Sequence, residues 1–167
     1  MQELAIKDLT ENFFEAIGKE WMLVTSGSKE KFNTMTASWG GIGFLWNKAV
    51  AFIFIRPERY TYEFIEKNDM LTLSFLGSGN RSIYNICGSK SGRDTDKIKE
   101  SGLLPLTIPD GNVTFEQARL TLECRKLYGQ LLSPEHFIDK SLPDKWYGAQ
   151  GNFHKVYVVE ILKVWEK

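Results

Sequence analysis

The sequence predicts a mainly β protein, an antiparallel barrel or sandwich with short helices at its periphery. Apolar and polar residues alternate along several short stretches, most clearly along 118–125. Short helical patterns lie between these stretches without a regular strand–helix alternation, which argues against a parallel sheet. No repeat, low-complexity tract or linker divides the 167 residues. We therefore expect a single domain over 1–167, of which 1–20 form an N-terminal helical segment.

The composition argues against several functional classes. Lys plus Arg and Asp plus Glu number 21 each, which gives a net charge of zero and no overall attraction to nucleic acid or to an acidic membrane surface. No apolar run approaches ~20 residues, and the N-terminus lacks the basic and apolar regions of a secretory signal. We therefore expect a cytoplasmic protein that binds neither membranes nor nucleic acid.

Cysteine and histidine are too few to predict a metal site. The two cysteines, Cys87 and Cys124, are expected to be free, partly buried thiols. The two histidines, His136 and His154, stand apart, and no CxxC or HxxxH spacing occurs. No metal ligand is therefore assigned.

In the first third of the chain, one helix and three strands are expected. The helix covers 10–17, with Thr10 as its N-cap and Gly18 at its end. The glycine-rich run 39–44, WGGIGF, is expected to be a loop or bulge. Strands are expected at 21–26, 31–38 and 49–55. The last of these, AVAFIFI, is apolar throughout and is predicted to be buried on both faces.

The remaining elements follow the same reasoning. Pro57 fits the first turn of a helix in which Tyr60 and Phe64 form an i, i+4 apolar pair. A polar glycine loop at 88–94 separates two further short helices, the second ended by Gly102. These helices are expected at 81–87 and 94–101. The later strands are expected at 70–76, 118–128 and 155–165.

The first candidate for a binding site is the uncharged run NTMTASWGGIGFLW at 33–46. Thr34, Thr36 and Ser38 would offer hydroxyl and backbone hydrogen bonds to a ligand lying along the strand. The glycines would let a flat ring approach the backbone, and one methionine and two tryptophans offer polarizable apolar surface. The alternative is a strand that ends in a glycine bulge, with its tryptophans in the core.

The second candidate is RPERYT at 56–61, which follows a buried strand and opens a helix. A helix N-terminus presents unpaired N–H groups and partial positive charge, which suit a phosphate. Arg56 and Arg59 add fork-shaped donors, and Thr61 adds a hydroxyl. The alternative is a solvated helix start in which Arg59 pairs with Glu63.

The third candidate is GSKSGRDTDK at 88–97, which combines small residues with Lys90, Arg93 and Lys97. Its backbone N–H groups would wrap an anion, although the spacing is not that of a Walker loop. The alternative is a flexible charged loop that caps the next helix through Asp94.

Together the three runs match a flat ring, a polar chain and a phosphate, which are the parts of FMN. A barrel without flavin, whose glycines and aromatics are purely architectural, is the rival interpretation.

With LECRKLYGQ and NFHKVYVVEI, these runs make the chain from about 21 to 165 resemble the flavin reductase-like family, the FMN-binding split barrels that include flavoredoxin. The resemblance implies a split β-barrel that forms a homodimer with one FMN per subunit near the interface. The residues that it implies for cofactor binding are Thr34, Met35, Thr36, Ala37, Ser38 and Trp39 at the ring and ribityl chain, Arg56, Arg59, Tyr60 and Thr61 at the phosphate, and Ser89, Lys90, Ser91, Gly92 and Lys97 on the second wall.

The resemblance also implies an activity. A NAD(P)H-dependent flavin reductase would pass a hydride from a nicotinamide to FMN, with NAD(P)H as a transient substrate because no GxGxxG motif follows a strand. His154 matches a histidine beside the nicotinamide in related reductases, and a structural hydrogen-bonding role is its alternative. An FMN-binding electron carrier or redox sensor without reductase turnover remains open. The segment 133–151 matches the family poorly, so the sequence does not predict the substrate.

Overall fold

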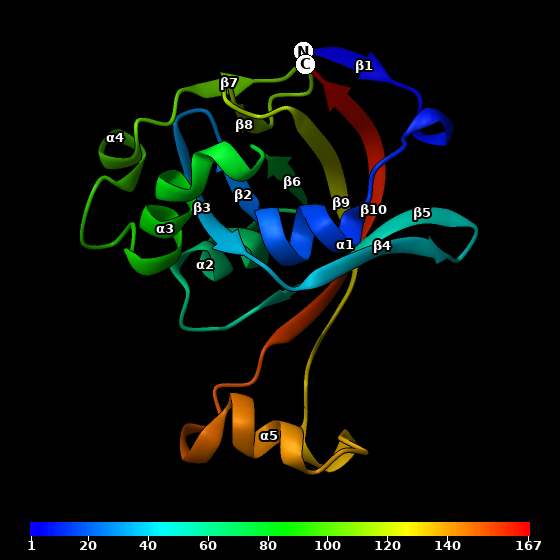
Figure 1. Cartoon of the computed structure of the whole chain (residues 1–167), viewed down its shortest axis with the longest axis vertical. Coiled ribbons are helices and arrows are strands. Elements are labelled where there is room, and N and C mark those ends of the chain that lie inside the picture. Colours follow the sequence, from blue (N-terminus) through cyan, green and yellow to red (C-terminus); the bar gives the residue numbers. More distant parts are fainter.

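The computed structural model describes residues 1–167. Its strands are β1 (Gln2–Leu4), β2 (Met22–Ser28), β3 (Lys31–Ala37), β4 (Gly40–Leu45), β5 (Lys48–Ile55), β6 (Met70–Phe75), β7 (Pro105–Thr107), β8 (Val113–Phe115), β9 (Leu120–Leu131) and β10 (Lys155–Glu166). Its α-helices are α1 (Phe13–Glu15), α2 (Tyr60–Lys67), α3 (Arg81–Ser89), α4 (Lys97–Ser101) and α5 (Ser141–Trp146). The mainly β prediction with peripheral helices is confirmed (Figure 1).

The strands form a split antiparallel barrel. Its eight-stranded sheet runs in the order β3-β2-β6-β9-β10-β5-β4, with β1 added beside β10, and β7 and β8 form a separate small sheet. The end strands β3 and β4 follow each other in the chain yet are not paired with each other, so the barrel stays open between them. Because β3 pairs only with β2, the backbone of its other edge is free of ladder hydrogen bonds.

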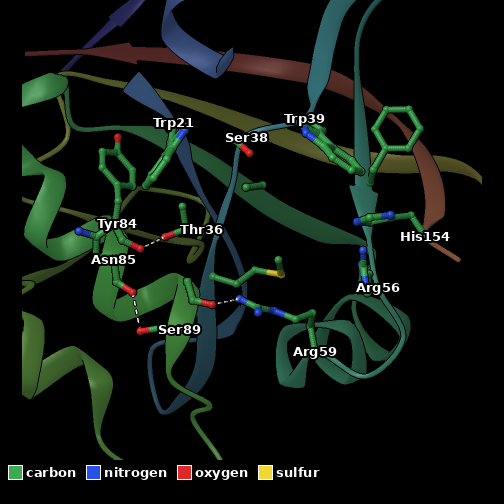
Figure 2. A pocket seen from close by; sticks show the side chains of 14 residues that line it. Trp21, Thr36, Ser38, Trp39, Arg56, Arg59, Tyr84, Asn85, Ser89 and His154 are labelled. Atoms are coloured by element: carbon green, nitrogen blue, oxygen red, sulfur yellow. Dashed lines mark hydrogen bonds between the residues drawn. The ribbon is translucent and has the colours of Figure 1, made fainter. Parts of the chain in front are cut away.

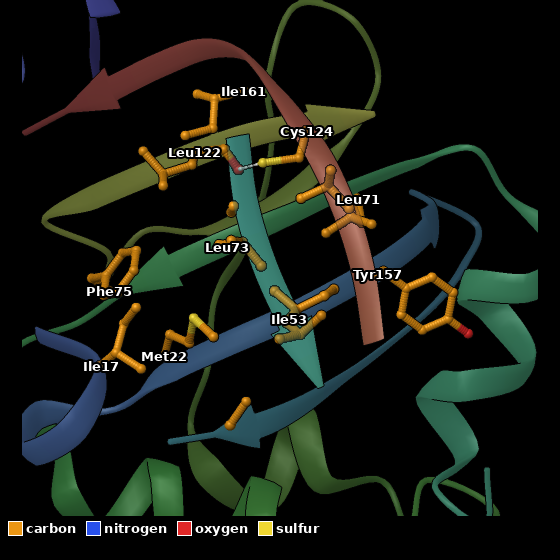
Figure 3. Packing of buried hydrophobic residues seen from close by; sticks show 14 of the residues in the cluster. Ile17, Met22, Ile53, Leu71, Leu73, Phe75, Leu122, Cys124, Tyr157 and Ile161 are labelled. Carbon is orange, nitrogen blue, oxygen red and sulfur yellow. Dashed lines mark hydrogen bonds between the residues drawn. The ribbon is translucent and has the colours of Figure 1, made fainter. Parts of the chain in front are cut away.

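Two apolar clusters hold the sheet and the helices together. The larger one has 20 buried residues and fills the barrel, and alternate residues of β6, including Leu71 and Leu73, point into it (Figure 3). The smaller one has eight buried residues, among them Tyr84 and Cys87 of α3, and packs that helix against the outside of β2 and β3. The second cluster matters for function because it fixes α3 beside the open edge of β3.

Residues 40–44 of the run 39–44 belong to a strand, so the prediction of a loop or bulge was wrong for all of it except Trp39. They form β4, which pairs with β5 from Gly40 opposite Ile53 to Leu45 opposite Lys48. The two-residue turn of this hairpin has positive φ at both Trp46 (52°) and Asn47 (58°), the geometry of a type I′ turn. Glycine is tolerated here because the strand lies at the edge of the sheet and comes very close to β5.

The prediction that β5 is buried on both faces was also wrong. Ala51, Ile53 and Ile55 are fully buried, whereas Phe52 and Phe54 on the opposite face are only partly buried. A continuous apolar run cannot distinguish a strand inside the core from one whose second face lines a site or an interface. Phe54 belongs to such a site, as described below.

The N-terminal segment differs from its prediction in both boundaries. Asn12, and not Thr10, is the N-cap of α1, because its side chain accepts from the backbone N–H of Phe14 and Glu15. Gly18 does not end the helix, since it lies inside a π-helix at Ala16–Glu20 that continues α1. Similarly, α2 begins at Tyr60 with Arg59 as N-cap, so Pro57 precedes the helix and is not in its first turn.

Most of the other predicted elements are confirmed, with the T-shaped Tyr60–Phe64 pair at 5.1 Å between ring centroids and Gly102 ending α4 with a φ of 72°. The three short strands β1, β7 and β8 and the helix α5 were not predicted. Both cysteines are free, and both are buried. No helix is both long and apolar enough to cross a membrane.

Residues 132–154, here called the arm, join β9 to β10. They include α5 and two short 3-10 turns, Pro134–His136 and Gly148–Gln150. Figure 1 shows the arm projecting beyond the barrel at the end of the two longest strands. The arm spans the segment 133–151 for which the sequence offered no interpretation.

We expect Gly40→Ala to destabilise the fold, because a Cβ at this position would lie 2.6 Å from the carbonyl oxygen of Phe52 and the backbone has a φ of 153°. Strain of this kind costs about 2 kcal/mol in the free energy of unfolding. The matched control is Gly41→Ala, where a Cβ meets no atom within 4 Å and should change stability by about 0.5 kcal/mol or less. Urea unfolding measures both values, and equal stability of the two variants would contradict this explanation.

Candidate functional site

A cleft of about 470 Å³ opens between the free edge of β3 and the helix α3. Residues from β3, the β3–β4 corner, the end of β5, the start of α2 and the residue before β10 also border it (Figure 2). The lining residues are Trp21, Met35, Thr36, Ala37, Ser38, Trp39, Phe54, Arg56, Arg59, Tyr84, Asn85, Gly88, Ser89 and His154. The cleft therefore combines aromatic walls with two guanidinium groups.

The wall formed by α3 is held against β3 by a side-chain hydrogen bond. Thr36 Oγ1 donates to the carbonyl oxygen of Tyr84 at 2.6 Å, and a Cβ at Gly88 would come within 3.4 Å of the Thr36 side chain. The Tyr84 hydroxyl in turn accepts from the backbone N–H of Leu76 at 2.7 Å. Thr36 therefore lies at the predicted place, although its hydroxyl proton is already used within the protein.

Thr34 is not part of the cleft. Its side chain is fully buried, its hydroxyl lies 2.8 Å from that of Thr25, and it also contacts the carbonyl oxygen of Val24 at 3.3 Å. The β4 glycines do not line the cleft either. Trp46 lies 57% exposed in the hairpin turn, outside both the core and the cleft of the single chain.

A second pocket of about 280 Å³ adjoins the cleft and shares Met35, Arg59 and Ser89 with it. Its other lining residues are Glu58, Tyr60, Thr61, Lys90, Ser91, Arg93, Asp94 and Lys97. The first turn of α2 and the Ser-Lys-Ser segment thus face each other across this pocket. The three sequence runs converge on two neighbouring cavities, with the aromatic residues mainly around the first and the cationic residues mainly around the second.

Lys97 is the most unusual group in the second pocket. It is only 3% exposed, and its single hydrogen-bond partner is the carbonyl oxygen of Lys90 at 3.4 Å. Burial lowers the pKa of Lys97 to about 8; the nearby Arg59 charge adds to this effect and the Cys87 thiol opposes it. A buried ammonium with one long hydrogen bond retains donor capacity for an anion.

The other basic residues of this region are more firmly engaged. Lys90 is ion-paired with Glu100, and Arg93 is ion-paired with Glu63. The guanidinium of Arg93 also lies over the Tyr60 ring at 4.8 Å. These contacts join the 90–96 segment to Glu63 of α2 and Glu100 of α4.

Two alternative contacts expected from the sequence are replaced by others. Arg59 does not pair with Glu63, because its Nη2 donates to the carbonyl oxygen of Gly88 at 2.7 Å. The cap of α4 is Asp96, whose side chain accepts from the backbone N–H of Lys99, and not Asp94. Arg59 therefore joins the N-terminus of α2 to the C-terminal end of α3, with its charge between the two cavities.

Gly92 lines neither cavity. A Cβ at this position would collide with the Asn33 side chain, whose Nδ2 donates to the Thr61 hydroxyl at 2.7 Å. Gly92 therefore lets the loop pack on β3 and α2, and its contribution to the site is indirect.

Arg56 lies in the cleft but not in the second pocket. Its Nη2 donates to the carbonyl oxygen of Trp146 at 3.0 Å, and its guanidinium lies 5.4 Å from the centre of the Tyr147 ring. The Trp146 ring also meets Trp39 edge-on at 5.1 Å. Arg56 thus attaches the arm to the barrel at the side of the cleft.

His154, the last residue of the arm, completes the cleft. Figure 2 shows its ring between Trp39 and Arg56. The His154 and Trp39 rings are 5.0 Å apart, and His154 Nδ1 is 2.9 Å from the Tyr147 hydroxyl. Burial, followed by repulsion from Arg56, lowers the pKa of His154 to about 4. The imidazole is therefore neutral at physiological pH.

Comparison with known proteins assigns the chain to a family. The model of the flavin reductase like domain matches residues 14–167. The chain belongs to the flavin reductase-like family. No curated protein matches it.

Solved structures share the fold of this flavin reductase-like protein. A flavoredoxin from Methanosarcina acetivorans has 21% identity and a TM-score of 0.66, covering 89% of this chain and 68% of its own. An FMN-binding protein from Thermus thermophilus with bound p-hydroxybenzaldehyde has 21% identity and a TM-score of 0.68, and the match covers 100% of this chain and 82% of the Thermus chain. An NADH:FAD oxidoreductase from Streptomyces globisporus has 13% identity and a TM-score of 0.64, and the match covers 89% of this chain and 75% of the Streptomyces chain. These likenesses establish the split-barrel fold.

Several residues of the flavin reductase-like cleft were not predicted from the sequence. Tyr84 and Asn85 belong to a helix that was expected, although nothing indicated which of its faces meets β3. The position of Phe54 could have been predicted in part, since it lies on the opposite face of β5 from Ile53 and Ile55. Trp21, which meets Tyr84 edge-on at 6.3 Å, had none. No group of His, Cys, Asp and Glu side chains is placed to hold a metal ion.

Proposed function

We propose that this flavin reductase-like protein binds FMN and acts as a NAD(P)H-dependent flavin reductase. The observation that carries the proposal is the position of Lys97, a buried and nearly unpartnered cation in a pocket that adjoins an aromatic cleft. The two cavities offer apolar surface for a flat ring and donors for a phosphate. Family membership adds support.

The donor set fits the phosphate of FMN. Lys97 and Arg59 supply positive charge, and the first turn of α2, at Tyr60 and Thr61, supplies backbone N–H groups. Ser91 adds a hydroxyl. Lys90, already paired with Glu100, contributes less than its place in the sequence suggested.

The cleft fits the ring of the same cofactor. Met35, Ala37 and Trp39 present apolar surface, and the free edge of β3 presents unpaired backbone groups. When bound, FMN supplies a ring that accepts hydride from a nicotinamide. Arg56 and Arg59 line the cleft, and their charges favour negative charge that develops within it.

The arm side of the cleft suits the second substrate. His154 and Trp39 lie there, and NAD(P)H would approach them as a transient substrate. Two similar structures support this class of activity, because one is described as an FMN-binding protein and another as an NADH:FAD oxidoreductase. Those descriptions concern the Thermus and Streptomyces proteins.

We expect FMN affinity to fall as the pH rises above about 8, because Lys97 loses its proton with a pKa of about 8 in the free protein. A bound phosphate stabilises the charged amine and raises its pKa, so binding takes up a proton above pH 8 and weakens by up to about tenfold per pH unit. Below pH 8 the amine is already charged and contributes no further pH dependence. Fluorescence titration of the apoprotein with FMN between about pH 7 and pH 9 measures this slope.

Lys97→Met should weaken FMN binding at pH 7 by about 1.5–3 kcal/mol, the usual contribution of a charged hydrogen bond, and should abolish the slope. The control is Lys99→Met, which removes an exposed lysine from the same helix. This variant should leave the FMN affinity at pH 7 and its pH dependence unchanged. A protein that does not take up FMN would contradict the cofactor proposal. An unchanged slope in Lys97→Met would exclude Lys97 from the phosphate site.

We expect anaerobic stopped-flow mixing with NADH or NADPH to bleach bound FMN faster than free FMN. His154→Ala should leave FMN bound and slow this reduction by about tenfold, the effect of one lost hydrogen bond of ordinary strength. If neither nicotinamide reduces the bound flavin faster than free flavin, the protein is an electron carrier or redox sensor and not a reductase. Loss of the fold in His154→Ala, seen by circular dichroism, would indicate a structural role.

We further propose that the protein is a homodimer with FMN near the interface, because β4 is a free edge whose hairpin exposes 73% of Phe44 and 57% of Trp46. Phe44→Glu combined with Trp46→Glu should convert the dimer to a monomer in sedimentation velocity experiments. Leu104→Glu, which alters an exposed leucine beside β7, is the control. A wild-type protein that sediments as a monomer at tens of micromolar would contradict the proposal.

A further inference from the structure

The Tyr147 side chain of the arm is held in one place by its neighbours. Its ring stacks on Phe153 at 4.4 Å between centroids with an interplanar angle of 30°, and it meets Phe137 edge-on at 6.2 Å. The Arg56 guanidinium lies 5.4 Å from the ring centre. The hydroxyl is thereby directed to His154 Nδ1 at 2.9 Å.

This contact favours one tautomer of the His154 imidazole. A phenol hydroxyl is a strong donor and a weak acceptor, whereas an unprotonated imidazole nitrogen is a good acceptor. This geometry therefore favours a hydroxyl that donates to Nδ1, which leaves the ring proton on Nε2. Burial and the Arg56 charge keep a second proton off the ring at physiological pH.

We propose that Tyr147 is a positioning residue that fixes His154 in the Nε2–H tautomer, so that His154 donates a hydrogen bond to a carbonyl oxygen of the second substrate. The inference rests on the proposed function for the identity of the reaction, and it adds the substrate group that the cleft recognises.

The chemistry of the site specifies the substrate class. A neutral N–H donor suits an uncharged acceptor such as a carboxamide or a conjugated ketone or aldehyde, whereas a charged imidazolium would favour a carboxylate. Trp39 lies 5.0 Å from the His154 ring and Phe54 lines the same cleft, so aromatic surface is available to a flat ring. The expected substrate is therefore a planar ring that carries a carbonyl group.

The first test is the tautomer itself, which needs neither FMN nor activity. Long-range ¹H–¹⁵N NMR distinguishes the two ring nitrogens, and a His136→Gln variant assigns the signals because the chain has only two histidines. We expect protonated Nε2 and hydrogen-bonded Nδ1 in the wild-type protein. In Tyr147→Phe, which keeps the ring and its stacking, the Nδ1 signal should shift to that of an unbonded nitrogen and the tautomers should mix.

The second test is a double-mutant cycle on nicotinamide reduction of the holoprotein. Tyr147→Phe should raise the apparent dissociation constant of the nicotinamide, slow its reaction, or both, by about 2–10-fold in all, the range for one neutral hydrogen bond. In a His154→Ala background, the same change should have no further effect, because Tyr147 acts through His154. Tyr128→Phe, which removes an exposed hydroxyl bonded to Gln130, is the control and should react like the wild type.

Each outcome decides the inference. A proton on Nδ1 in the wild type, an unchanged Nδ1 signal in Tyr147→Phe, or additive effects of the two substitutions would overturn it. If the holoprotein does not react with either nicotinamide, the proposed function fails. The NMR result then decides separately whether Tyr147 sets the tautomer.

Discussion

The attachment of α3 to the open edge of β3 is the interaction on which the site depends. The Thr36 hydroxyl donates to the Tyr84 carbonyl, and Gly88 lets the helix approach that side chain closely. The contact fixes α3 as the wall that faces the free edge of β3 across the cleft. The eight-residue apolar cluster beneath α3 supports the contact, because burial of its side chains holds the helix in place.

Electrostatics within the site contrast with the neutral chain. The protein has a net charge of zero, and several of its surface cations, Lys90 and Arg93 among them, have an acidic partner. Arg59 and Lys97 form no ion pair and lie close to each other. Burial lowers the pKa of each side chain. A buried, unneutralised cation such as Lys97, with the half-buried Arg59 beside it, is costly for folding, which agrees with the anion proposed for this pocket.

Much of the architecture could be predicted from the sequence, because alternation reports directly on strands with one buried face. The prediction was wrong at β4, since tertiary pairing with β5 overrides the low strand propensity of glycine. Thr34 and Thr36 share a face of β3, yet the Thr34 hydroxyl is buried against Thr25 and Val24 of β2 whereas that of Thr36 meets α3. No periodicity in the sequence distinguishes them, because the difference lies in what packs on each end of the strand. The arm could not be predicted either, as its contacts with Trp39 and Arg56 depend on a fold that only the barrel provides.

The short connection from β3 to β4 has a consequence for how such a protein can diversify. Ser38 and Trp39 alone tie the two end strands together, so the seam of the barrel is covalently fixed at that corner and the barrel itself leaves little freedom there. The arm between β9 and β10 can vary more in length and sequence, because none of its residues belongs to either apolar cluster. A change of length or sequence in the arm would therefore alter what meets the cleft while the barrel folds as before.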